Sequence, residues 1–418
     1  GTKDLKYNIG FSHNDEKSIM QGSGYAKNNV NAKINANLNK WLSLDFNGRM
    51  AFTKLDGLNG GADTNESSAA NSVVANTVRW NPVEPLSSSS DEDEENSTST
   101  RRNPTERITD TYKYQERFQQ NYNVGLNWKP FKNITFRSEF GYGWKYNNTD
   151  QVWGSNATTN SKYGYNGQPQ AQFVRLENKN WRNANTLTYD NKKLFHGRDH
   201  INVLVGQEWS SSQDVTRTNT SVAFPTSFTL NEVLANTAAG TALPNEGNIK
   251  AEENILSYFG RINYNYKEKY LLEANLRYDG TSKFPSGMKW RWFPSFSAGW
   301  RLSEEAFMEW AKPALNSLKL RGSWGIIGDQ TVDNGLYVSS LGTGQVNWLG
   351  ADGQKLFYRG TPSAVASSIT WQDIATLDLG FDARFFHGDF GVTFDWYQRD
   401  TRNMIVPGSG IAYTFGAA

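Results

Sequence analysis

The stretch Tyr270-Leu-Leu-Glu-Ala-Asn-Leu-Arg-Tyr278 alternates between apolar and polar residues over its whole length. The apolar set occupies the even positions, which are Tyr270, Leu272, Ala274, Leu276 and Tyr278. A period of two predicts a β-strand with one apolar face and one polar face. Tyrosine at both ends of the apolar face is typical of a strand that crosses a bilayer, because aromatic rings settle at the two interfaces.

The same alternation recurs along most of the chain. Windows with a clear period of two cover residues 30–38, 42–52, 118–128, 134–144, 201–209, 256–266, 292–302, 318–326, 377–385 and 390–396, with shorter ones at Leu5 to His13 and Thr186 to Tyr189. We therefore expect about thirteen antiparallel strands, each with an apolar row that faces outward.

The connections between these strands alternate in length. Short turns are expected at Asn39-Lys40 and at residues 129–133, 267–269 and 386–389, while long polar loops are expected near 55–111, 147–169, 216–249 and 327–371. Barrels of the outer membrane place short turns on the periplasmic side and long loops outside the cell. Ser303-Glu304-Glu305 additionally predicts a capped, short helix from Ser303 to Pro313 inside one short connection.

Composition excludes several classes of protein. The 418 residues have a mean hydropathy of -0.68 and contain no apolar run long enough for a transmembrane helix. The absence of cysteine from the chain excludes thiol catalysis and disulfides, and a formal net charge of +1 gives no case for a nucleic-acid partner. A soluble β-sandwich also alternates, but the number of strands, their aromatic ends and the alternating loop lengths favour a barrel.

One part of the chain closely resembles the SusC/RagA family of TonB-dependent outer-membrane transporters. The resemblance rests on Phe259-Gly-Arg-Ile-Asn-Tyr-Asn-Tyr266, on the segment from Leu276 to Phe284, and on Trp292-Phe-Pro-Ser-Phe-Ser-Ala-Gly-Trp-Arg-Leu-Ser-Glu-Glu305. It extends to Leu320-Arg-Gly-Ser-Trp-Gly-Ile-Ile-Gly-Asp-Gln330 and to residues 377–405, and early strands near Tyr7 and Leu38 look similar.

This resemblance implies an all-β fold, a transmembrane antiparallel β-barrel of roughly twenty-two strands in a Gram-negative outer membrane. The chain would supply its central part, with the N-terminal plug and the closing strands outside these residues. Implied partners are a SusD-like surface lipoprotein as a lid, the TonB-ExbB-ExbD complex acting through the plug, outer-membrane lipid, and a second transporter–lid pair in a dimer. The implied function is uptake of oligosaccharides or peptides, without a cofactor and without catalysis.

Two sets of residues are candidates for functional contacts. Polar rows such as Arg137, Glu139 and Lys145, or Arg277 and Asp279, are expected to line the lumen and to pair with one another or with the plug. Aromatic residues of the expected extracellular loops could stack on cargo or pack within the loops and against the lid. These are Trp80, Trp153, Tyr163, Tyr165, Tyr337, Trp348, Tyr358 and Trp371.

Motifs for metal binding and catalysis are weak. The acidic run at Asp91 to Glu95 offers oxygen ligands for Ca²⁺, but it lacks the spacing of an EF-hand and is typical of a solvated loop. The pair His196 and His200 has helical spacing in a region that predicts strand, which argues against zinc. Gly141-Tyr-Gly143 lies inside a predicted strand and is no nucleotide loop.

Two alternatives remain open from the sequence. The chain could belong to a secreted β-rich protein that binds or hydrolyses glycans, although nothing selects a pair of catalytic carboxylates. It could also form a passive porin, which would lack the plug.

Overall fold

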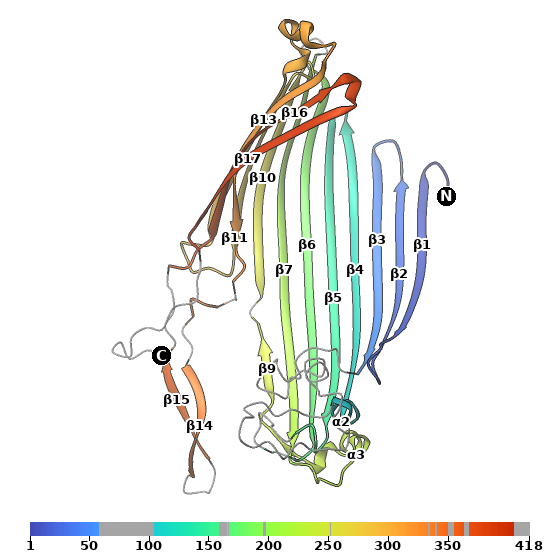
Figure 1. Cartoon of the computed structure of the whole chain (residues 1–418), viewed down its shortest axis with the longest axis vertical. Helices are drawn as coiled ribbons and strands as arrows, with labels where there is room; N and C mark the ends of the chain where they lie inside the picture. The colour runs from blue at the N-terminus through green and yellow to red at the C-terminus, as the bar shows by residue number, and fades with distance from the viewer. Residues whose placement is uncertain are drawn as a thin grey trace.

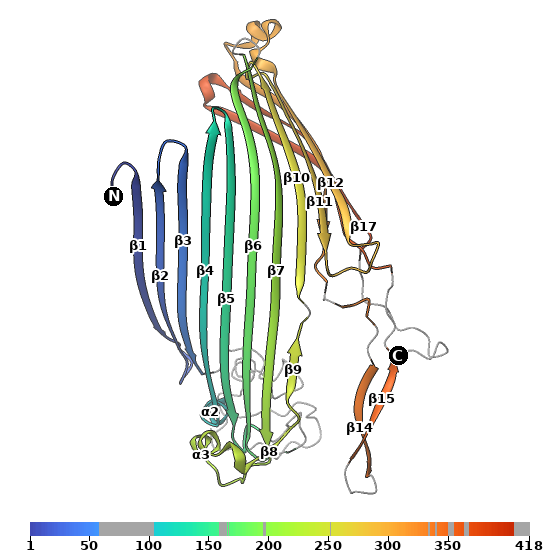
Figure 2. The same ribbon diagram turned by 180° about the vertical axis from the view of Figure 1, so that it is seen from behind.

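The computed structural model describes residues 1–57, 104–158, 165, 167–194, 198–250, 252–332, 335–338, 341–349, 355–362 and 368–404. These residues form one large antiparallel sheet of 15 strands and a separate two-stranded sheet. Figures 1 and 2 show the large sheet as a single curved wall of long strands. In the described part of the chain, none of the helices is long and apolar enough to cross a membrane.

The strands of the wall follow the order of the chain. Along the path they are β1 (Leu5–Lys17), β2 (Gly24–Asn37), β3 (Leu42–Asp56), β4 (Thr111–Phe131), β5 (Ile134–Trp153), β6 (Gln170–Leu194), β7 (Asp199–Val222), β10 (Glu253–Tyr266), β11 (Tyr270–Thr281), β12 (Trp290–Arg301), β13 (Leu315–Asp329), β16 (Gln372–Phe385) and β17 (Phe390–Arg402). Two short strands, β8 (Thr241–Ala242) and β9 (Glu246–Ile249), add to the far end of β7. Thirteen strands on one path agree with the number expected from the alternation.

A second, small sheet stands apart from the wall. Strands β14 (Leu341–Leu349) and β15 (Lys355–Pro362) pair with each other and with no described strand of the wall. They branch from the segment between β13 and β16, at the long-loop end of the molecule (Figure 1). They lie within the connection that the sequence predicts as a long loop.

The register brings aromatic residues of the apolar face into two belts. At one level Tyr258, Tyr278 and Trp292 lie opposite one another, and Tyr278 and Trp292 stack with ring centroids 4.2 Å apart. At the other level Tyr266, Tyr270 and Trp300 stack at successive centroid distances of 6.2 Å. Eight residues separate the belts on β10, β11 and β12.

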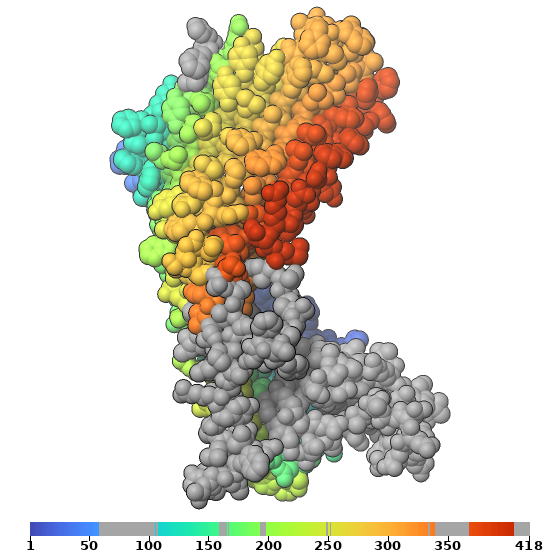
Figure 3. Space-filling model, turned by 90° about the vertical axis from the view of Figure 1, so that its left-hand side faces the viewer, coloured from blue at the N-terminus to red at the C-terminus, as the bar shows by residue number. Residues whose placement is uncertain are grey.

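The spacing of the belts matches a membrane. Eight residues of strand rise by about 27 Å, or roughly 20 Å along the membrane normal at the usual tilt, close to the apolar band of about 25 Å in outer-membrane barrels. The side chains between the belts are exposed, with Leu272 at 51% and Leu276 at 46%. Figure 3 shows the later strands crossing this face obliquely. The apolar face is therefore the one that contacts lipid.

Strands β4 to β7 continue far beyond the belt of Tyr258, Tyr278 and Trp292, toward the end of the wall that carries helices α2 (Pro104–Thr109) and α3 (Leu230–Ala235) (Figure 1). Tyr258 of that belt lies opposite Gln207 of β7, which lies opposite Asn185 of β6. Yet β6 begins at Gln170, and the neighbouring β5 and β7 reach Trp153 and Val222. The strands thus occupy part of the segments 147–169 and 216–249 that the sequence predicts as loops. The alternation rule missed them because polar residues such as Asn148, Asp150 and Lys179 replace the apolar row beyond the belt.

The two ends of the wall differ as expected. Short turns join the strands at one end, where Asn133, Lys267 and Glu268 take positive φ. Helices α2 (Pro104–Thr109) and α3 (Leu230–Ala235) lie at the other end (Figure 1). α3 packs through Val233 onto Val152 and Phe224, which anchors the long connection after β7 to the ends of β5 and β6.

The capped helix expected from Ser303 to Pro313 is wrong in detail. This connection holds two 3₁₀ segments, η4 (Leu302–Glu304) and η5 (Ala306–Ala311), and neither has a side-chain cap. Ser303 is buried. Glu305 instead turns to the strands, where its carboxylate accepts hydrogen bonds from Tyr270 Oη at 2.7 Å and Trp300 Nε1 at 3.1 Å.

Candidate functional site

The polar face of the wall carries networks of ion pairs that cross several strands. In the first, Arg137 on β5 pairs with Asp45 on β3 at 2.9 Å and with Glu139 at 2.8 Å. Arg182 on β6 then contacts Glu139 at 3.2 Å and Glu208 on β7 at 2.6 Å. The network joins β3 to β7, and it confirms the expected pairing of Arg137 and Glu139.

A glycine makes the longest of these contacts possible. Arg137 and Asp45 lie on strands separated by β4, whose Gly125 faces Asp45 on one side and Glu139 on the other. A Cβ atom at Gly125 would lie 2.8 Å from the Arg137 guanidinium. The missing side chain therefore leaves the space through which Arg137 reaches across a whole strand.

The second network is centred on Arg321 of β13. Its guanidinium lies 2.5 Å from Asp395 on β17, 3.2 Å from Asp382 and 3.6 Å from Asp378 on β16. Gly380 of β16 lies between Arg321 and Asp395, and a Cβ there would come within 2.6 Å of the Asp395 carboxylate. Three carboxylates thus converge on one guanidinium, and Lys319 lies opposite Asp382 on the same pair of strands.

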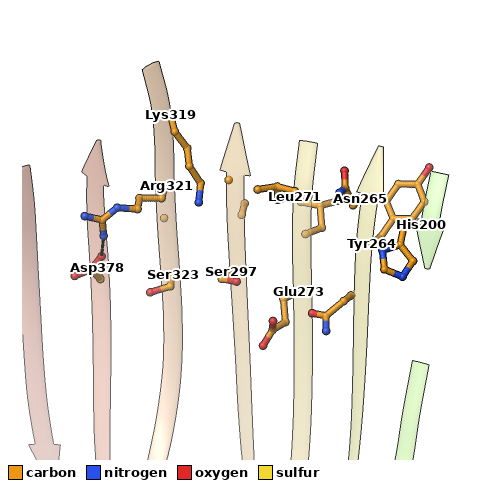
Figure 4. Close-up of a pocket in the computed structure, with 15 residues that line it drawn as sticks. His200, Tyr264, Asn265, Leu271, Glu273, Ser297, Lys319, Arg321, Ser323 and Asp378 are labelled. Atoms are coloured by element: carbon orange, nitrogen blue, oxygen red, sulfur yellow. Dashed lines mark ion pairs between the residues drawn. The ribbon is translucent and has the colours of Figure 1, made fainter. Parts of the chain in front are cut away.

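A hollow of about 360 Å³ opens on the polar face near the short turns (Figure 4). It is lined from six strands, β7, β10, β11, β12, β13 and β16. Lys319 and Arg321 of β13 and Glu273 of β11 line it, and Arg321 points to Asp378. Both signs of charge are thus presented to whatever occupies the interior at this level.

A more compact cluster lies on the same face, further from the short turns. The Arg277 guanidinium donates to Ser257 Oγ at 2.7 Å, pairs with Asp279 at 2.7 Å and lies 5.3 Å from the centre of the Phe259 ring. Phe259 in turn fills the space over Gly206, where a Cβ would be 2.6 Å from the ring. The expected pairing of Arg277 with Asp279 is confirmed. Lys145 lies on the polar face between Gln119 and Asn178.

The structure separates the expected loop aromatic residues by burial. Trp153 is fully buried and Trp371 is 3% exposed. Trp371 packs edge-to-face on Phe284 and Phe293 and donates from Nε1 to the Lys289 carbonyl at 2.8 Å, and Tyr337 packs against the same cluster. Tyr165 is 37% exposed. The side chains of Trp80, Tyr163, Trp348 and Tyr358 lie outside the described residues.

Among the expected loop aromatic residues whose side chains the structure describes, Tyr165 is the most exposed. Its backbone carbonyl accepts a hydrogen bond from Gln170 Nε2 at 3.2 Å, which ties it to the start of β6. In this chain the rings of Trp153 and Trp371 are used for packing. Cargo contact by any of the eight residues stays a prediction.

Histidine and acidic residues form no metal site among the described residues. His200 Nε2 pairs with Asp190 at 2.6 Å, and His13 Nδ1 lies 2.8 Å from Asn28 Oδ1. His196 and the acidic run from Asp91 to Glu95 lie outside the described residues. Gly141 and Gly143 lie inside β5, as predicted.

Tyr114 and Glu305 are among the groups outside the membrane band whose pKa is shifted. Burial and the hydrogen bond from Tyr114 Oη to Glu116 at 2.7 Å raise the pKa of Tyr114, on the extended part of β4, to about 12. In the connection between β12 and β13, the hydrogen bonds from Tyr270 and Trp300 lower the pKa of Glu305. Both shifts reflect structural pairing, since neither group lies at a site where a reaction could occur.

Residues 55–418 match the family described as TonB dependent receptor-like, beta-barrel. The chain belongs to this family. Its members are outer-membrane transport proteins rather than enzymes, which confirms the all-β barrel fold, the outer-membrane location and the SusC/RagA resemblance expected from the sequence.

Named relatives are consistent with this assignment. The chain is 28% identical to the TonB-dependent receptor P26 of Formosa agariphila over 295 residues, which cover 67% of the chain and 27% of P26. It is 32% identical to the TonB-dependent receptor SusC of Bacteroides thetaiotaomicron over 156 residues, or 36% of the chain and 15% of SusC. The chain thus spans about a quarter or less of these relatives.

Solved structures share the fold of the wall. The RagAB peptide transporter superposes on 100% of the chain with a TM-score of 0.76 and 18% sequence identity, covering 45% of the matched RagAB chain. The receptor in the FpvAI–pyocin S2 complex superposes on 95% of the chain with a TM-score of 0.54 and 12% identity. The described sheet therefore corresponds to part of a larger TonB-dependent barrel.

Sequence reasoning missed the roles of Arg182, Arg321, Gly125 and Gly380. The glycines themselves were a signal in the sequence. Glycine weakens the interior of a strand, so its presence there often marks a place where another group approaches the backbone closely. Both glycines lie at polar-face positions beside an arginine of a neighbouring strand. That neighbour relation depends on the register, which a single strand does not reveal.

Proposed function

We propose that the full-length protein imports oligosaccharides or peptides across the outer membrane and that this chain forms the central wall of its barrel. The supporting observation is the division of the sheet into two faces. One face carries a lipid-facing band between two aromatic belts, and the other carries charge networks such as that of Arg182 with Glu139 and Glu208. A wall of this kind separates lipid from a polar passage.

The polar face has the properties expected of a surface that binds the plug domain. Its two networks hold charged side chains of both signs in positions fixed by ion pairs, as around Arg182 and Arg321. In the proposed mechanism, TonB with ExbB and ExbD pulls on the plug and the wall stays rigid. The cross-strand ion pairs would provide that rigidity.

The tall extension of β4 to β7 gives the extracellular end a surface for a lid. A SusD-like surface lipoprotein over this end would close the passage after cargo binds. α3 and its contacts with Val152 and Phe224 fix the rim on this side. RagAB, which has the same fold in its barrel, is a peptide transporter, and the exposed ring of Tyr165 suits either a peptide or a sugar.

The proposal is tested by uptake in the natural host. The gene for the full-length protein is deleted and restored, and the entry of fluorescent oligosaccharides and peptides is followed with and without an ionophore that collapses the proton gradient. We expect one cargo class to depend on the gene and to stop entering when the gradient collapses. Entry that depends on the gene but persists without the gradient would contradict energised import and support a passive porin.

Purification from outer membranes tests the partners separately. Mass spectrometry of the complex extracted in mild detergent should find an N-terminal plug in the same polypeptide and a co-purifying surface lipoprotein. A barrel polypeptide without either would contradict the proposed lid and plug. Binding of labelled cargo to the purified complex would then identify the cargo class.

A further inference from the structure

The connection between β12 and β13 exposes two large aromatic rings on one short segment. Trp310 of η5 is 79% exposed, more than any other aromatic side chain in the described part of the chain, and Phe307 is 59% exposed. Figure 1 shows this connection as the orange coil at the short-turn end of the wall. Both rings are therefore available to a partner outside the wall.

The segment η5 has three different sides. In a 3₁₀-helix, side chains three residues apart lie above one another, so Phe307 and Trp310 share one side, which we call the aromatic side. Ala311 lies on a second side and is buried. Glu309 and Lys312 share the third side, where their charged groups are exposed and lie 3.7 Å apart. The segment is therefore amphipathic, with a charged side next to the aromatic side.

The aromatic side continues one of the two belts. The Phe307 ring packs edge-to-face on Trp300 with ring centroids 6.5 Å apart, and Trp300 belongs to the belt of Tyr266, Tyr270 and Trp300. Glu305, just before η5, accepts hydrogen bonds from Tyr270 Oη and Trp300 Nε1 of the same belt. The segment is thus attached to the lipid-facing side of the strand ends and not to the lumen.

The end of the connection is also held in place. The backbone N–H of Phe386, in the turn between β16 and β17, donates to the Ala314 carbonyl at 3.0 Å. The backbone N–H of His387 donates to Asn316 Oδ1 at 2.6 Å. The connection is therefore tied to the wall both before and after η5, which fixes the position of the two exposed rings relative to the belt.

The depth of the aromatic side follows from these contacts. Aromatic belts lie at the boundary between the hydrocarbon core and the headgroups, so the contact with Trp300 places Phe307 at this boundary. Three residues of 3₁₀-helix rise by about 6 Å, and the headgroup region of each leaflet is roughly 5–7 Å thick. Trp310 therefore lies no further from the boundary than about the depth of the headgroup region.

We propose that the aromatic side of η5 is inserted into the periplasmic leaflet of the outer membrane, so that its partner is a phospholipid surface. Amphipathic segments with aromatic residues on one side and charged residues on the other bind at this level of a bilayer. Tryptophan is enriched there because its ring is apolar and its N–H is polar. The lipid-facing surface of the wall continues directly into the aromatic side, because Phe307 contacts the belt.

A cation at the same level suits a phospholipid surface. Lys267, in the turn between β10 and β11, places Nζ 5.0 Å from the centre of the Tyr266 ring of the belt. A lysine that lies along an aromatic belt keeps its ammonium group at the level of the lipid phosphates. The inference rests on the membrane position of the sheet and does not require the proposed import.

Fluorescence quenching by lipid tests this position. Trp310→Cys is introduced into the full-length protein, from which any cysteine elsewhere has been removed, and is labelled with the fluorophore NBD. The protein is reconstituted in phosphatidylcholine nanodiscs that contain lipids with a nitroxide near the top of the acyl chain. Glu309→Cys is the matched control, because its side chain is 71% exposed on the charged side of the same turn. Resistance of the barrel to SDS before heating checks that both variants fold.

We expect quenching by the nitroxide to be about threefold or more stronger at Trp310→Cys than at Glu309→Cys, and quenching by aqueous iodide to show the reverse order. Equal nitroxide quenching of the two folded variants would overturn the proposal. Stronger iodide quenching at Trp310→Cys than at Glu309→Cys would also overturn it, because the aromatic side would then face water.

Photo-cross-linking in native outer membranes distinguishes lipid from a protein partner. Trp310→Cys is labelled with a benzophenone maleimide and illuminated, and the peptide that contains the label is analysed by mass spectrometry. We expect adducts with the mass of a single phospholipid. A cross-link to another polypeptide, or to another segment of the full-length protein, would show that protein covers the aromatic side and would contradict the proposal.

Discussion

Arg321 on β13 and Asp395 on β17 lie 2.5 Å apart although β16 runs between their strands. The contact passes over Gly380, which carries no side chain to block it. Arg137 and Asp45 repeat the arrangement over Gly125 at 2.9 Å. In both places a glycine on the intervening strand lets an arginine form an ion pair with a strand that is not its neighbour.

A side chain at Gly380 should disrupt the contact between Arg321 and Asp395. Alanine for glycine normally stabilises a compatible site by about 0.4–1 kcal/mol, but at Gly380 the new Cβ would lie 2.6 Å from the Asp395 carboxylate and from the Phe394 carbonyl. We expect Gly380→Ala to destabilise the barrel by about 1–3 kcal/mol, as overpacking does. Urea unfolding in detergent, followed by tryptophan fluorescence, measures the change.

Gly391→Ala is the matched control for this variant. Gly391 also lies inside a strand, but a Cβ there meets nothing closer than the Ala383 carbonyl at 4.0 Å. It should leave the urea midpoint unchanged or raise it. Equal destabilisation by the two variants would show that the space over Gly380 is not what matters.

A charge in the middle of the lipid-facing band should be costly. Ala274 lies halfway between Tyr270 and Tyr278 on the apolar face of β11. Arginine at the midplane of a barrel costs about 2–4 kcal/mol, so Ala274→Arg should lower the free energy of unfolding in lipid vesicles by that amount. Asn275→Arg points into the lumen beside Glu273 and should cost much less. Equal costs would mean that the two faces do not differ.

The link between Arg182 and Glu208 should contribute modestly. The pair is short at 2.6 Å, but Arg182 is 48% exposed, so water and salt screen it. A double-mutant cycle with Arg182→Ala and Glu208→Ala should give a coupling of about 1 kcal/mol or less that shrinks as salt is raised. A large coupling that does not respond to salt would contradict a solvated polar face.

Glu305 should make stability depend on acid pH. Hydrogen bonds from Tyr270 and Trp300 lower its pKa from the ordinary 4.5 in the folded state. The stabilisation is therefore fully present above pH 4.5 and is lost as pH falls through the lowered folded value. Glu305→Gln removes the titrating group, so the difference in melting temperature between wild type and variant should narrow in acid. A difference that stays constant would rule out this linkage.

Trp153 and Tyr165 should separate stability from cargo binding. Trp153 is fully buried, and Trp153→Ala should cost about 3–5 kcal/mol of stability. Tyr165→Ala should leave the melting temperature unchanged and weaken cargo binding by about 0.5–1.5 kcal/mol, the usual contribution of a stacked ring. Calorimetry of the purified complex with its cargo measures both. Unchanged cargo affinity in Tyr165→Ala would remove this residue from the binding surface.

The fold was predictable because the bilayer imposes a simple rule on sequence. Between the belts every second residue must be apolar, so strands such as β11 and β12 can be recognised one at a time. Beyond the belt of Tyr258, Tyr278 and Trp292 this rule no longer applies. The sequence therefore predicted that the parts of β5, β6 and β7 beyond Trp144, Trp181 and Trp209 are partly loop. Nothing in a single strand shows that its polar residues pair with those of the next.

The candidate site was predictable only in part for the same reason. Arg137, Glu139, Arg277 and Asp279 were recognised because charge partners occur two residues apart on one face. Arg182 and Arg321, at the centres of the two ion-pair networks, could not be recognised in this way because their partners lie on other strands.

Site-directed spin labelling of β11 in the full-length protein, reconstituted in lipid nanodiscs, tests most directly whether this sheet is the wall of a membrane barrel. Single cysteines from Leu271 to Arg277 are labelled, and collisions with oxygen and with a water-soluble nickel chelate are measured. We predict that Leu272, Ala274 and Leu276 favour oxygen, with a maximum at Ala274, while Leu271, Glu273, Asn275 and Arg277 do not. Equal access of the nickel chelate to both sets would contradict the membrane wall and the importer built on it.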